Sequence, residues 1–187
     1  MKSLDKNSVI EEIDKQLDYL RNVRALLPYL DDTVIGKKMI NTAPYYQNSG
    51  FNITFGFSKE LKKADVDKIN SIGHWINQNY IIRIYSLLEA FNILSDKQRI
   101  DKTFDGWEEV DLIRRLRHKF AHSSGRYNPN DKDSKELYDK ILTLFRLTDI
   151  KSSADATEFP LSIDEVLEPL TEGCKKYILN LDSKNSM

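Results

Sequence analysis

The sequence has one cysteine, few glycines and prolines, and no long apolar run. Cys174 alone cannot form an internal disulfide, which is typical of a protein in a reducing cytoplasm. Seven glycines and five prolines in 187 residues, with 40% hydrophobic residues, exclude disorder over most of the chain. No apolar run approaches the ~18 residues that span a bilayer, and the first residues lack the apolar stretch of a signal peptide. We therefore expect a globular, cytoplasmic protein that does not enter a membrane.

The chain also lacks a strong net charge. Its 28 Lys and Arg residues nearly balance 29 Asp and Glu residues, which leaves a net charge of −1. A strongly basic domain would indicate nucleic-acid binding by its total charge, so a nucleic-acid site here has to be a local patch. The length suits one domain, expected to cover residues 1–187, and we expect residues 182–187 to be a frayed tail.

Helical periodicity of apolar residues runs through most of the chain. Ile13, Leu17 and Leu20 recur at steps of four and three, which predicts a helix over residues 8–29 that starts at a capping box of Ser8 and Glu11. Similar spacing predicts four further helices, over 65–94, 105–124, 134–147 and 162–181. Pro169 lies within the last of these helices and should kink it, because its ring removes one backbone donor.

One segment has a period of two instead. Its apolar residues alternate with polar residues or glycine: Phe51, Ile53, Phe55 and Phe57. This pattern predicts a strand, with residues 33–40 as a weaker candidate partner. We expect a structural β arm at residues 33–58, and the alternative is an arm that contacts substrate or a partner through Tyr45 and Tyr46. The predicted fold class is all-α: an up-and-down bundle of about five helices with a small two-stranded β arm between the first two.

The most concentrated basic run is Arg114-Arg-Leu-Arg-His-Lys-Phe-Ala-His122. His118 and His122 are spaced i, i+4 and therefore share a helix face. His122 lies in the last predicted turn, where the helix dipole favours imidazolium while Arg117 opposes it. Such a balance suits general acid–base chemistry. Arg117 and His122 lie about 140° apart on an ideal helix, so they converge if the helix ends or distorts there, or across a twofold axis.

The segment Arg117-His-Lys-Phe-Ala-His122, at the end of a helix in an all-helical domain, resembles the R-x4–6-H motif of the HEPN superfamily. The run Tyr80-Ile-Ile-Arg-Ile-Tyr-Ser-Leu-Leu-Glu-Ala-Phe91 resembles the long core helix of such domains. The resemblance in architecture covers about residues 65–181, whereas the specific motif covers six residues.

The resemblance implies a homodimer with the two motifs facing each other, and a metal-independent endoribonuclease of a toxin–antitoxin or phage-defence system. Arg117 would contact the scissile phosphate, His122 would act on the 2′-hydroxyl or the leaving oxygen, and His118 would orient His122 or serve as a second acid–base group. RNA would be the substrate and an antitoxin protein a possible partner. We predict that the neighbouring basic residues bind the RNA: Arg114, Arg115, Lys119 and Arg126. No cofactor or metal is expected.

Three other interpretations stay open. A basic run at a helix end is common for electrostatic reasons alone, so a purely structural role is possible for Arg117 and His122. His118 and His122 at i, i+4 are also a geometry that holds Zn²⁺, although a zinc site needs at least one more ligand. In the third interpretation, the protein is a non-catalytic dimeric module of the same fold that binds RNA or a protein partner.

Overall fold

The computed structural model describes residues 5–42, 53–95, 99–122, 126–148 and 150–181. Within them lie five α-helices and one antiparallel pair of strands, which confirms the predicted fold class. The elements, in chain order, are α1 (Lys6–Leu26), the 3-10 turn η1 (Asp32–Val34), β1 (Met39–Thr42), β2 (Ile53–Gly56), α2 (Lys63–Ala90), α3 (Trp107–His122), α4 (Lys132–Phe145), the π-helical segment η2 (Ile163–Leu167) and α5 (Glu168–Asn180).

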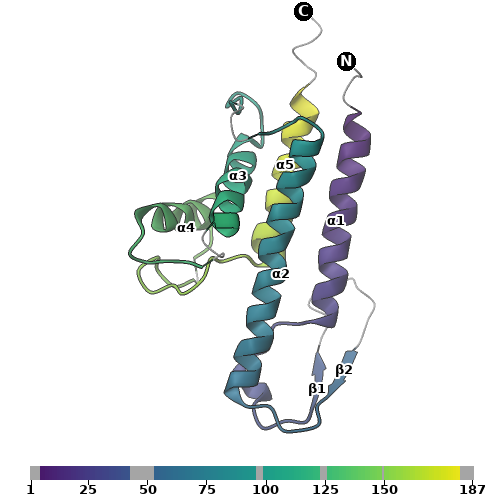
Figure 1. The fold of residues 1–187 in the computed structure, drawn as a ribbon, viewed down its shortest axis with the longest axis vertical. Coiled ribbons are helices and arrows are strands. Elements are labelled where there is room, and N and C mark those ends of the chain that lie inside the picture. The colour runs from purple at the N-terminus through teal and green to yellow at the C-terminus, as the bar shows by residue number, and fades with distance from the viewer. Residues whose placement is uncertain (1–4, 43–52, 96–98, 123–125, 149, 182–187) are drawn as a thin grey trace, which may run out of the picture.

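Helices α1, α2 and α5 lie side by side along the long axis of the molecule (Figure 1). Helix α3 packs against α2 and α5, and α4 lies on the outer side of α3 and runs across this axis (Figure 1). The two strands lie at the far end of the long helices from the start of α1 and the end of α5 (Figure 1). The end of α3 is thus held between the bundle and α4.

Helix α1 begins at Lys6, and the predicted start at a Ser8–Glu11 box is wrong. The carboxylate of Asp5 accepts a hydrogen bond of 3.3 Å from the Ser8 backbone N–H and caps the helix, so Ser8 lies within the first turn. The helix ends at Leu26 and not at Tyr29, since Pro28 disfavours helical backbone at the residue before it.

Helix α2 ends at Ala90, four residues before the predicted end at Leu94. Asn92 adopts a left-handed conformation with φ of 56°, and the N–H of Ile93 bonds back to the Leu88 carbonyl at 2.8 Å. Asparagine tolerates this conformation and terminates helices in this way. Ile93 and Leu94 are nevertheless buried, because the chain turns them back into the core.

The β arm forms, but the partner strand differs from the prediction. Phe55 pairs with Ile40 in the antiparallel ladder, and strand β1 occupies only Met39–Thr42. The earlier part of the predicted partner, around Thr33, is the 3-10 turn η1, in which the Asp31 side chain accepts the Thr33 N–H at 2.8 Å. Tyr45 and Tyr46, which would be the contact residues in the alternative interpretation of the arm, lie outside the described residues.

The last predicted helix is divided into η2 and α5. Ser162 precedes η2, and its hydroxyl donates to the Glu165 carboxylate at 3.2 Å instead of capping a backbone N–H. The N–H of Leu167 reaches the Ser162 carbonyl at 2.9 Å, which is the wider spacing of a π-helix. Pro169 therefore lies in the first turn of α5, where its missing donor has little effect.

Helix α3 begins in close backbone contact with α5. Gly106 has φ of 84°, and a Cβ atom built on it would lie 1.9 Å from the Gly173 carbonyl oxygen. A Cβ on Gly173 would in turn lie 2.3 Å from Cγ of Glu109. Because neither residue has a side chain, α3 starts directly against α5. Cys174, next to this contact, is fully buried, and burial raises the pKa of its thiol.

Candidate functional site

The basic run lies on α3, which is anchored by an apolar face. The residues of this face are all buried in the core: Val110, Ile113, Leu116 and Phe120. Their burial fixes the rotation of the helix and leaves the basic residues at its edges. Helix α3 ends at His122, close to the predicted end at residue 124, which lies outside the described residues.

Arg117 faces helix α2. The carbon at the centre of its guanidinium lies 4.7 Å from the centre of the Tyr85 ring, and Tyr85 is fully buried. The cation therefore stacks on an aromatic face whose position the core fixes. Arg117 remains partly accessible to solvent.

His118 and His122 meet on the exposed side of the helix end. Their ring centres are 4.5 Å apart at an angle of 51°, and both residues are exposed. The structure thus confirms the shared face that the i, i+4 spacing predicts. Across the described ranges, no cluster of three or more His, Cys, Asp or Glu side chains is arranged to hold a metal ion. The two imidazoles are adjacent acid–base groups at the surface.

The arginines that precede the motif form intramolecular ion pairs. An amino group of Arg114 lies 2.7 Å from a carboxylate oxygen of Asp111. Arg115 bridges to α4, at 3.2 Å from Asp133 and 3.0 Å from Glu136. These contacts neutralise part of the positive charge that the sequence concentrates here, and they attach α3 to α4.

Lys119 is also paired, with Asp131 and Asp133 at the start of α4. Burial lowers the pKa of Lys119, but hydrogen bonds to the two carboxylates outweigh this and raise it overall. Asp131 is the N-cap of α4. Its hydrogen bond from Lys119, supported by one from Ser134, lowers the pKa of its carboxyl to about 2. Both partners are therefore charged at neutral pH.

A shallow hollow of about 520 Å³ adjoins the motif between α3 and α4. Lys119, Arg126 and Asn128 line it together with Asp131. Arg126 is exposed. Tyr127 is buried beneath it, where its hydroxyl donates to the Ser153 carbonyl. Of the basic residues predicted to bind RNA, Lys119 and Arg126 thus share one surface, whereas Arg114 and Arg115 are held by acids beside it.

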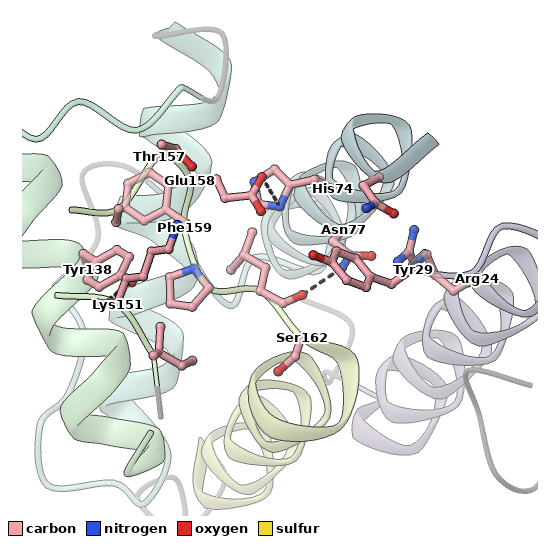
Figure 2. A pocket seen from close by; sticks show the side chains of 15 residues that line it. Arg24, Tyr29, His74, Asn77, Tyr138, Lys151, Thr157, Glu158, Phe159 and Ser162 are labelled. Carbon is pink, nitrogen blue, oxygen red and sulfur yellow. Dashed lines mark hydrogen bonds and ion pairs between the residues drawn. The ribbon is translucent and has the colours of Figure 1, made fainter. Parts of the chain in front are cut away.

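A second site was not predicted from the sequence. A cavity of about 460 Å³ lies between α1, α2 and the segment before α5 (Figure 2). His74 and Asn77, one turn apart on α2, line it with the buried Arg24 of α1. The feature of the sequence that could have indicated this site is the pair of polar residues His74 and Asn77, at i, i+3 on a largely apolar helix.

The exposed large apolar side chains of the described residues lie away from α3. Tyr19, Val23 and Leu26 are exposed along α1, and Ile72 and Trp75 are exposed on α2. The surface of α3 around Arg114 to His122 is instead polar and charged. A second protein that docks on α3 would therefore contact polar and charged side chains, whereas one that docks on α1 and α2 would contact apolar side chains.

Comparisons with protein-family models, with curated proteins and with solved structures found no match to this chain. Among the described helices, none has both the length and the apolar character required to cross a bilayer.

Proposed function

We propose that this protein is a metal-independent endoribonuclease of HEPN type that cleaves RNA at the end of α3. The observation that supports this most is the grouping of one fixed guanidinium and two adjacent imidazoles within one and a half turns. Arg117 is stacked on Tyr85, and His118 and His122 are exposed with ring centres 4.5 Å apart. The groups required for transesterification of RNA thus lie on the last turn and a half of α3, with Arg117 on the α2 side and the two imidazoles on the exposed side.

The proposed reaction is attack by a ribose 2′-hydroxyl on the adjacent phosphorus. The oxygen–phosphorus bond forms as the bond to the 5′-oxygen breaks, which leaves a 2′,3′-cyclic phosphate and a free 5′-hydroxyl. His122 accepts the proton of the 2′-hydroxyl, and an imidazolium, that of His118 or of the second protomer, returns a proton to the leaving oxygen. Arg117 stabilises the negative charge that develops on the phosphate oxygens.

We propose that two chains act together. One chain offers a small site in which Arg117 and the histidines occupy different sides of α3, and an isologous dimer would place the Arg117 of one chain near His122 of its partner. In this account the hollow beside Lys119 and Arg126 guides the RNA backbone. We also propose a role as a toxin or in defence against phage, with a cognate antitoxin, because this is what the resemblance of residues 117–122 to the HEPN motif implies.

A second candidate is a non-catalytic dimeric module of the same fold that binds RNA or a protein. The ion pairs favour the protein-binding form of this module, because Arg114, Arg115 and Lys119 are each neutralised by carboxylates of the same chain. Such pairing weakens an RNA-binding surface and strengthens the link between α3 and α4.

Cleavage of RNA in the presence of EDTA separates the two candidates. Arg117→Ala and His122→Ala should each reduce cleavage by roughly 10²–10³-fold or more. The control Lys68→Ala removes an exposed charge from α2 and should have no effect. Circular dichroism verifies that each variant folds. Activity that persists in His122→Ala, or that requires added Mg²⁺, would contradict the proposal.

A further inference from the structure

The cavity between α1, α2 and residues 150–162 has the size of a ligand site. Its volume of about 460 Å³ lies within the ~300–1,000 Å³ typical of small-molecule pockets. Figure 2 shows His74 and Asn77 of α2, Arg24 of α1, Tyr29 shortly after the end of α1, and Phe159 of the segment before α5 around it. Much of the remaining wall is apolar, and Ile150, Ala156 and Leu161 contribute to it.

Two buried polar atoms of α2 have no hydrogen-bond partner among the described protein atoms. Asn77 is only 5% exposed; its Nδ2 donates to the Leu161 carbonyl at 2.7 Å, while its Oδ1 accepts no hydrogen bond. His74 directs Nδ1 toward the Glu158 carboxylate at 3.6 Å, and its Nε2 has no partner. Buried polar atoms are normally satisfied, so these two atoms indicate that another molecule donates to them.

The wall of the cavity also carries buried positive charge. Arg24 is 3% exposed, and its guanidinium packs so closely on Gly73 that a Cβ there would lie 1.6 Å from Nη1. Among the described lining residues, Glu158 is the one acid, and its side chain is 58% exposed at the rim. Burial lowers the pKa of His74; Glu158 partly opposes this shift, and the charge of Arg24 adds to it.

We propose that this cavity binds a small organic anion with an apolar body. Its carboxylate or phosphate group pairs with Arg24, because a guanidinium is a fork that matches either anion. An N–H or O–H group on the same ligand donates to Asn77 Oδ1 or His74 Nε2. The site is separate from the histidines of α3, and the proposal does not depend on the proposed ribonuclease activity.

Isothermal titration of the full chain tests the site with two matched pairs of probes. AMP is compared with adenosine, and 4-aminobenzoate with 4-aminobenzamide, so that each anion has an uncharged counterpart of similar shape. We expect at least one anion to bind at least about tenfold more tightly than its counterpart, the difference that one charge-assisted hydrogen bond provides. The pair that shows this difference identifies phosphate or carboxylate as the bound group.

Two variants assign the binding to this cavity. Arg24→Met removes the charge and should abolish the preference for the anion. Glu158→Gln changes an exposed acid at the rim, is not expected to disturb folding, and should tighten anion binding severalfold because it removes like charge. Lys68→Ala, at an exposed residue of α2 that does not line the cavity, should match the unmodified chain.

The proposal is overturned if neither anion binds more tightly than its uncharged counterpart, which would leave the cavity to water. It is also overturned if a folded Arg24→Met variant still binds the anion more tightly than its uncharged counterpart. If Arg24→Met does not fold, the Glu158→Gln comparison decides: unchanged affinity rejects the site, and increased affinity supports it.

Discussion

The guanidinium of Arg117 lies 4.7 Å from the centre of the Tyr85 ring, and this contact joins α3 to the core of α2. A cation on a buried ring gains up to ~2 kcal/mol, and the ring restricts the positions that the long arginine side chain can take. Tyr85 therefore acts as a positioning residue for the charge that the proposed reaction needs.

Replacing Tyr85 tests this role. Tyr85→Leu should reduce RNA cleavage by roughly 5–30-fold, the factor that 1–2 kcal/mol represents, while Tyr85→Phe keeps the aromatic face and should retain most activity. The readout is kcat and KM for an RNA oligonucleotide, together with thermal unfolding to separate positioning from stability. Equal losses in the two variants would show that the ring face is not what positions Arg117.

The Lys119–Asp131 pair predicts an acid-dependent stability. Because the folded-state pKa of Asp131 is lowered to about 2, its carboxylate stabilises the fold above the unfolded value near 4, and this stabilisation is lost as pH falls from about 4 to about 2. Asp131→Asn should therefore lose less stability than the unmodified chain over this range, while its amide oxygen still caps α4.

Urea denaturation at pH 4.5 and pH 2.5 measures this difference. Lys119→Met should reduce the same pH dependence, since the bond from Lys119 is the main cause of the lowered pKa. An unchanged pH dependence in both variants would mean that the pair does not form in solution.

The Gly106–Gly173 contact predicts a large effect of one methyl group. Gly36→Ala and Gly106→Ala both place alanine at a φ near +84°, which costs ~1–2 kcal/mol. Gly36 has no atom within 4 Å of an added Cβ, whereas Gly106 meets a backbone carbonyl at 1.9 Å. Gly106→Ala should therefore destabilise the fold by clearly more than Gly36→Ala in chemical denaturation. Equal losses would contradict the close approach of α3 to α5.

The proposed dimer predicts where a new charge disrupts assembly. Ala121→Glu introduces an acid on the exposed last turn of α3, and Val23→Glu introduces one on the exposed apolar side of α1. If the dimer uses the surface around Arg114 to His122, sedimentation at micromolar concentration should show Ala121→Glu as a monomer and Val23→Glu as a dimer. The reverse result would move the interface to α1 and α2.

The helices were predictable from the sequence wherever the local spacing of apolar residues determines them. The buried face of α1, with Ile13, Leu17 and Leu20, follows from spacing alone. Helix ends were less predictable because Asp5 and Ser8 are both good caps, and because Ile93 and Leu94 continue the apolar pattern of α2 beyond its left-handed Asn92.

The site was predictable only in part. Adjacent positions on one helix, such as His118 and His122, follow from its periodicity. The pairing of Lys119 with Asp131 depends on how the chain turns between α3 and α4, and the cavity joins Arg24, His74 and Glu158 from three distant segments. Such contacts depend on tertiary packing, which a single sequence does not display.

The measurement that tests the central proposal most directly is the chemistry of the RNA ends. An oligonucleotide with one ribose among deoxyriboses is incubated with the protein in EDTA, and the products are analysed by mass spectrometry. The account predicts cleavage after that ribose, with a 2′,3′-cyclic phosphate on one product and a 5′-hydroxyl on the other, and no products with His122→Ala. An intact oligonucleotide, cleavage at a deoxyribose, or a 5′-phosphate end would contradict it.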